Sequence, residues 1–182
     1  MVGAFDILLY MALDILFFAL VLIHSSAIAL GVGSSTIAIG GFLTAIADGT
    51  FDEGERRIMG FVYVSLRIAM WMIVVFSLLI MWMRPEFFGD FTVPMWVMTA
   101  VLFVNAFLMT KHWITPKLGP AFQAGTWYTL GFLITAYVFK LFPLTTEVFL
   151  YFYLAMLVLA VVIVNGCMKY LAMRRAKKQP TA

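Results

Sequence analysis

Residues 7–47 decide the fold, and they read ILLYMALDILFFALVLIHSSAIALGVGSSTIAIGGFLTAIA. In this stretch of about 41 residues only Asp14 and His24 have side chains that can carry a charge near neutral pH. A helix that crosses a membrane needs about 20 consecutive apolar residues, so the stretch is about twice as long as one crossing requires. We therefore expect a long first helix that crosses the membrane over residues 7–31.

The continuation after Gly31 is harder to place. Residues 36–47 are apolar but too few to cross a bilayer by themselves. The first helix is expected to continue through them, with a bend at Gly31-Val32-Gly33 as one way to accommodate the length. A re-entrant segment over residues 31–47 is the alternative, and it requires protein to cover its free backbone groups.

Composition places the whole chain in lipid. Of its 182 residues 64% are hydrophobic and 12% are charged, whereas soluble domains are about 45 to 50% apolar and about 25% charged. A chain of this size cannot bury so much apolar surface in water. The single cysteine, Cys167, excludes a scaffold of internal disulfides.

Four further apolar runs follow the first helix. They cover residues 58–83, 94–113, 124–142 and 148–171. Asp52 and Glu55 form a helix start signal before the second span. The fold class is therefore expected to be all-α, a polytopic bundle of five transmembrane helices over residues 1–172, followed by a basic tail over residues 173–182.

The basic residues indicate the orientation of the bundle. With five spans, Arg84 and Lys140 lie on one side of the membrane. The other side has nine cations: Arg56, Arg57, Lys111, Lys117, Lys169, Arg174, Arg175, Lys177 and Lys178. Lys and Arg are enriched in cytoplasmic loops, so we expect the N-terminus outside and the C-terminus in the cytoplasm. The same distribution accounts for the net charge of +3 without a nucleic-acid partner.

Tryptophans support the span ends. Trp82, Trp96, Trp113 and Trp127 all fall near an expected boundary, as in an interfacial aromatic belt.

His24 is the first candidate functional residue. It shares a helix face with Ala27 and Gly31, and the run Ala27-x-x-x-Gly31-x-x-x-Ser35 is a stripe of small residues that lets a helix or a flat macrocycle approach closely. The alternatives for His24 are an interhelical hydrogen bond, ligation of a metal or haem, and proton handling. The stripe also offers a docking face for a second copy or a partner membrane subunit.

Arg67 is the second candidate, because it is permanently charged and lies near the middle of its span. Tyr63 and Trp71, one turn away on either side, offer a cation–π sandwich. Asp14 is the only carboxylate within the spans with which it could pair. The alternatives are a structural role, as a charge pair or as the cap of a carbonyl cluster, and an anchor for an anion such as a carboxylate or a haem propionate.

Three further polar residues lie within or beside the spans. Asn105 and His112 are seven residues apart on one face of the third span, and Asn165 lies in the fifth. His112 is a weaker candidate ligand, because a haem ligated by two histidines needs both at nearly the same depth.

A resemblance adds to this interpretation. Its motifs, in chain order, are Ile23-His24, Gly31-Val32-Gly33, Asp48-Gly49 and Glu55-Arg56-Arg57 before an apolar helix. This arrangement, over about residues 20–116, resembles small membrane proteins of the copper-resistance-D and membrane protoporphyrinogen-oxidase type. The resemblance implies a four- or five-helix bundle that binds or processes haem, here haem b, with His24 as a ligand. The oxidase type has a lysine early in its third span where this chain has Trp96, Val97 or Met98, so oxidase activity is not implied.

Three functional hypotheses follow. The first is a haem-associated or redox membrane subunit that uses His24. The second is a small ion or solute channel or transporter whose polar path includes Asp14, Arg67, Asn105 and Asn165. The third is a structural subunit of a larger membrane complex that docks through its small-residue stripes. No catalytic signature is found that defines an enzyme.

Overall fold

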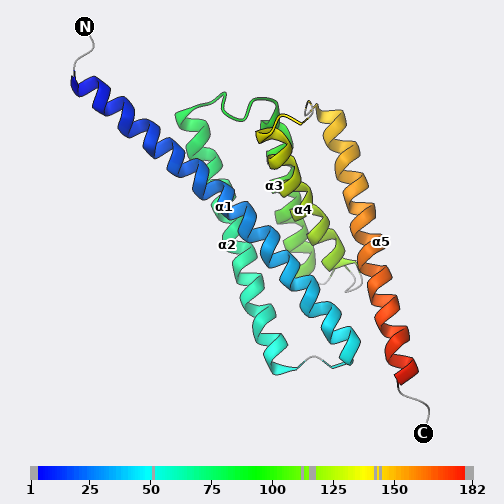
Figure 1. The fold of residues 1–182 in the computed structure, drawn as a ribbon. Helices are drawn as coiled ribbons and strands as arrows, with labels where there is room; N and C mark the ends of the chain where they lie inside the picture. Colours follow the sequence, from blue (N-terminus) through cyan, green and yellow to red (C-terminus); the bar gives the residue numbers. More distant parts are fainter. Residues whose placement is uncertain are drawn as a thin grey trace.

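A computed structural model describes residues 4–50, 52–111, 113–114, 118–141, 143 and 145–178. Its elements are, in chain order, α1 (Ala4–Asp48), α2 (Glu53–Met83), the 3-10 helix η1 (Gly89–Phe91), α3 (Thr92–Thr110), α4 (Gly119–Val138) and α5 (Thr146–Lys178). The helices pack side by side into a bundle (Figure 1). Over the described residues no strand is present, so the expected all-α class is confirmed.

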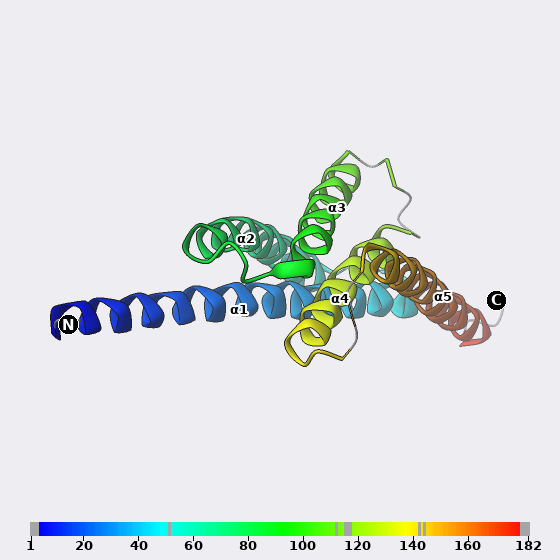
Figure 2. The ribbon, with the colours of Figure 1, turned by 90° about the horizontal axis from the view of Figure 1, so that it is seen from above.

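Helix α1 is one unbroken helix of 45 residues, about 67 Å long at 1.5 Å per residue. It continues as a helix through Gly31 and Gly33, so residues 31–47 are not a re-entrant segment. Figure 2 shows its N-terminal part extending beyond the other helices, where the side chains of residues 5–16 are exposed. Its C-terminal part packs against α2, α4 and α5.

Helices α1 and α2 are antiparallel neighbours joined by a tight turn. The predicted start signal is a capping box: the Glu55 backbone N–H donates to the Asp52 carboxylate, and the Asp52 N–H donates to the Glu55 carboxylate. The register brings Met59 against Gly41. As a result, residues near the end of α1 face the start of α2.

Over the described residues, four helices and not five are long and apolar enough to cross a membrane: α1, α2, α3 together with η1, and α5. The predicted fourth span, over residues 124–142, was wrong in this respect, although helix α4 (Gly119–Val138) forms over most of it. Half of its 20 residues are buried, among them Thr126, Trp127 and Thr129. Because α4 packs against α1, α3 and α5, its polar groups contact protein, and it needs less apolar character than a lipid-facing helix.

Most described cations lie at one end of the bundle. The α1–α2 turn and the C-terminal end of α5 lie at this end (Figure 1). Helix α5 continues to Lys178, so residues 173–178 of the expected tail are helical. The guanidinium of Arg175 packs against Gly49, whose φ of +75° lets the α1–α2 turn close beneath it.

Candidate functional site

Asp14 is paired at the opposite end of the bundle from the α1–α2 turn. Its carboxylate accepts a hydrogen bond from Arg84, whose guanidinium also lies 4.4 Å from the centre of the Phe17 ring. The candidate pair of Asp14 with Arg67 is not formed, because the antiparallel register brings the C-terminal end of α2, with Arg84, beside Asp14. The pair is largely exposed in the isolated chain.

His24 is part of the core. Its side chain is 1% exposed, and its Nε2 lies 3.0 Å from Oγ of Ser77 on α2. The ring of Phe88, from the segment that folds back between α2 and α3, lies 5.7 Å away. Of the three alternatives, this geometry corresponds to an interhelical hydrogen bond in a packed site.

The small-residue face of α1 is occupied by the chain itself. Ala27 and Ser35 are buried, and a Cβ at Gly31 would overlap the indole of Trp127 on α4. Trp127 is fully buried, so its expected place in the interfacial belt was wrong. The space beside Gly31, which a macrocycle would need, is therefore filled by an aromatic ring of the same chain.

Asn105 belongs to a buried polar network that joins three helices. Its Nδ2 donates to Oγ1 of Thr126 at 3.0 Å, and that hydroxyl also lies 3.2 Å from the Tyr153 hydroxyl. The Thr126 hydroxyl in turn donates to the carbonyl of Phe122. Asn105 therefore connects α3 to α4 and α5 instead of lining a polar path.

This network yields a stability prediction. Thr126→Val keeps the side-chain shape but leaves the Asn105 amide and the Tyr153 hydroxyl without their shared partner. We expect the free energy of unfolding in neutral detergent to fall by about 1 to 3 kcal/mol. Thr135→Val on the same helix is the matched control, because the exposed Thr135 hydroxyl donates only to the Gly131 carbonyl. Equal losses in both variants would contradict a structural role for the network.

Of the last two polar candidates, only Asn165 is described by the structure, and its side chain bonds within its own helix. The Asn165 amide donates to the Val161 carbonyl of its own helix turn. His112 lies outside the described residues.

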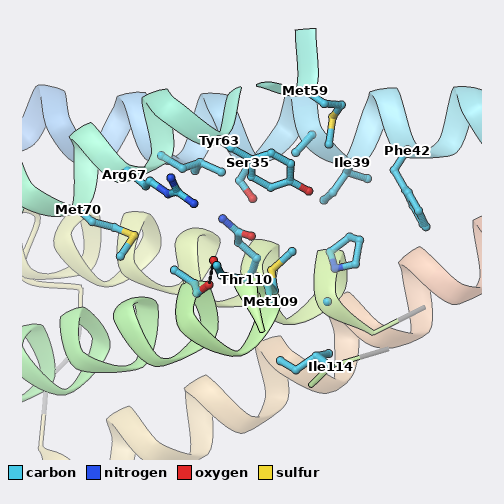
Figure 3. A pocket seen from close by; sticks show the side chains of 16 residues that line it. Ser35, Ile39, Phe42, Met59, Tyr63, Arg67, Met70, Met109, Thr110 and Ile114 are labelled. Carbon is cyan, nitrogen blue, oxygen red and sulfur yellow. Dashed lines mark hydrogen bonds between the residues drawn. The ribbon is translucent and has the colours of Figure 1, made fainter. Parts of the chain in front are cut away.

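Arg67 lines a cavity of about 380 Å³, which we call the Arg67 cavity. Its walls come from the C-terminal half of α1, the first half of α2, the end of α3 and the start of α4. Figure 3 shows Ser35, Tyr63 and Thr110 around the same space as Arg67. Arg67 lies 14 residues after the start of α2, which is about 21 Å along the helix.

The guanidinium of Arg67 has no hydrogen bond, ion pair or ring contact with any residue that the structure describes. The cation–π sandwich with Tyr63 and Trp71 is not formed; Trp71 packs edge-on against Phe103 of α3 instead. Among the described residues that line the cavity, Arg67 is the only charged one. A charge within a membrane span costs about 2.5 kcal/mol or more, so it favours an anionic partner.

Several lining residues were missed by the sequence analysis. Ser35 was noted only as a small residue, and Thr110 and Gln123 were not noted. Each lies on a different helix, so no spacing along the chain brings them together. Only the α3–α4 packing and the α1–α2 register place them around Arg67.

The described residues offer little for a metal. They contain no group of three or more His, Cys, Asp or Glu side chains that could hold a metal ion. A second, mostly apolar cavity of about 240 Å³ lies between α1, α4 and α5 and includes Cys167 but none of the predicted site residues. His24 lines neither cavity.

The fold and these cavities define a helical membrane protein with a cavity that is lined by one exposed arginine. No family model, no curated protein sequence and no solved structure matches the chain. The resemblance to the copper-resistance-D type therefore stays a prediction.

Proposed function

We propose that this multi-pass membrane protein binds a small organic anion in the Arg67 cavity. The observation that supports the proposal is an exposed arginine without a partner among the described residues, on the wall of a cavity of about 380 Å³. Sites for small molecules are typically cavities of about 300 to 1,000 Å³ with mostly apolar walls and a few polar groups. The Arg67 cavity has this composition.

The chemistry of the walls favours an anion with an apolar body. A guanidinium presents a planar fork of N–H donors that fits a carboxylate with two parallel hydrogen bonds. Met59, Met70 and Met109 supply adaptable apolar surface around it. Of the four residues of the expected polar path, only Arg67 belongs to the proposed site. The side chains of Asp14, Asn105 and Asn165 form hydrogen bonds elsewhere in the protein.

The test is equilibrium binding of radiolabelled hexanoate to the protein in phosphatidylcholine nanodiscs at pH 7. Arg67→Gln is expected to weaken binding about ten- to hundredfold, because charged hydrogen bonds contribute about 1.5 to 3 kcal/mol. Arg56→Gln on the same helix removes the same charge outside the cavity and is expected to bind like the unmodified protein. Absence of saturable binding, or equal losses in both variants, would overturn the proposal.

The orientation of the bundle in the membrane is also part of the proposal. We infer that the end of the bundle with Arg56, Arg57 and the basic end of α5 faces the cytoplasm, because short cytoplasmic segments are enriched in Lys and Arg. The N-terminus is then outside, because α4, although it is not one of the four apolar spans, runs back through the bundle to the end where α5 begins (Figure 1). The Arg67 cavity then lies in the cytoplasmic half of the protein. A cysteine-reactive, membrane-impermeant label on Lys177→Cys, with Cys167 replaced by serine, would test this arrangement in oriented vesicles, since Lys177 is exposed at the end of α5.

Haem ligation by His24 and docking of a partner or second copy through the small-residue stripes stay predictions. For haem, the Nε2 of His24 would first have to leave Ser77. For docking, the stripe from Ala27 to Ser35 is covered by the chain itself. The neighbouring run of small residues Gly41-x-x-x-Ala45 has Met59 of α2 packed against Gly41. An absorption spectrum with added haem and the mass of the detergent-solubilised particle would test them.

A further inference from the structure

The Arg67 cavity is elongated, and its two ends differ in chemistry. Figure 3 shows Arg67 and Met70 at one end and Phe42 and Met59 at the other. Arg67 and Met59 are eight residues apart on α2, which is about 12 Å along the helix axis. The end at Phe42 lies toward the α1–α2 turn, and the end at Arg67 lies deeper in the bundle.

We propose that the ligand is a carboxylic acid with a single alkyl chain of about eight to ten carbons, and that its carboxylate binds Arg67 while the chain extends toward Phe42. The inference rests on the proposed anion-binding function and specifies its ligand. An extended chain advances about 1.3 Å per carbon when its bonds are about 1.5 Å long, so this length matches the distance between the two ends.

The position of the charge determines which way the ligand lies. Arg67 is the only charged side chain among the described lining residues, and it lies at the deep end. Electrostatic attraction is stronger in a medium of low dielectric constant, so an anion gains more at this end than near the aqueous boundary. The apolar side chains of Ile39 and Phe42 then surround the far end of the chain.

The charge balance favours a carboxylate over a phosphate. One guanidinium neutralises one carboxylate, whereas a phosphate monoester carries about 1.5 to 2 negative charges at pH 7. The described part of the cavity wall contains no second cation. A phosphate would therefore keep uncompensated charge inside the membrane.

The experiment is a competition series in which unlabelled carboxylates of four to twelve carbons displace radiolabelled hexanoate in phosphatidylcholine nanodiscs, with free concentrations measured. Affinity is expected to rise about three- to fourfold per methylene, because each buried methylene contributes a constant increment, and to level off at about eight to ten carbons. Arg67→Gln is expected to lower every affinity by the same factor without changing the increment.

Two substitutions at the far end test the length limit in opposite directions. Phe42→Ala lengthens the cavity and is expected to move the plateau to chains about two to three carbons longer, whereas Phe42→Trp is expected to move it to shorter chains. In both variants the affinity for butanoate is expected to stay within about twofold of that of the unmodified protein. Ile37→Ala is the matched control on α1, since Ile37 is 55% exposed and does not line the cavity.

The outcomes separate the two proposals. If the affinities of the carboxylates depend on Arg67 but not on chain length, the chain inference is overturned and the anion site stays in place. Tighter binding of octyl phosphate than of octanoate would overturn the choice of carboxylate. A Phe42 effect on butanoate as large as on decanoate would overturn the orientation. Loss of all saturable hexanoate binding in the unmodified protein would overturn the proposed function itself.

Discussion

Trp127→Ala is expected to lower the free energy of unfolding by about 3 kcal/mol, which is the largest loss we expect from one substitution in this protein. Trp127 is fully buried where α4 packs on Gly31 of α1. Truncation of a buried tryptophan in a soluble core costs about 3 to 5 kcal/mol. The lower value is expected here, because in lipid the loss comes from packing contacts more than from transfer out of water.

The measurement is unfolding of the purified protein in neutral detergent by titration with a denaturing detergent. Trp82→Ala is the matched control, since Trp82 is 83% exposed, and its effect is expected to stay within about 0.5 kcal/mol. Trp127→Phe is expected to fall between the two, because the Trp127 Nε1 has no hydrogen-bond partner among the described residues and only ring volume is lost. If Trp127→Ala and Trp82→Ala have equal effects, α4 is not packed as described.

Gly31→Ala is expected to destabilise the protein by about 1 to 3 kcal/mol, although alanine is the better helix former. The new methyl group would overlap the indole of Trp127, and a fully buried ring cannot move aside without displacing its neighbours. Gly33→Ala is expected to do the opposite. A Cβ at Gly33 meets no atom within 4 Å, so the change is expected to stabilise the helix by about 0.5 to 1 kcal/mol.

The two sites are in contact, so their effects are expected to be coupled. In a Trp127→Ala background, Gly31→Ala is expected to lose its cost, because the atoms that its methyl group would overlap are gone. The same unfolding measurement on the four proteins gives the coupling energy. Additive effects would show that Gly31 is needed for a reason other than the approach of Trp127.

The role of this contact extends to the Arg67 cavity. Helix α4 forms part of the cavity wall through its first turns, and the Trp127 contact holds the same helix against α1. A variant at Gly31 is therefore expected to alter the cavity without touching it. Binding experiments on Arg67 should use variants whose unfolding curves match the unmodified protein.

Sequence alone determined that this chain is an all-helical membrane protein with a long first helix, because hydropathy and helix length depend only on the order of residues. It also located the capping box at Asp52, since a cap is made by residues three positions apart. Arg67 was recognised as a candidate for the same reason: its cost inside a span follows from its charge and its position in the helix.

Tertiary structure decided which of these groups meet. The antiparallel register of α1 and α2 paired Asp14 with Arg84 and placed His24 beside Ser77. It left Arg67 without a partner among the described residues. Packing also placed Trp127 against Gly31. It made α4 a helix that packs against three others and is not among the four described helices that are long and apolar enough to cross a membrane. Register and helix rotation depend on the joint fit of side chains from several helices, and no local pattern in the sequence specifies that fit.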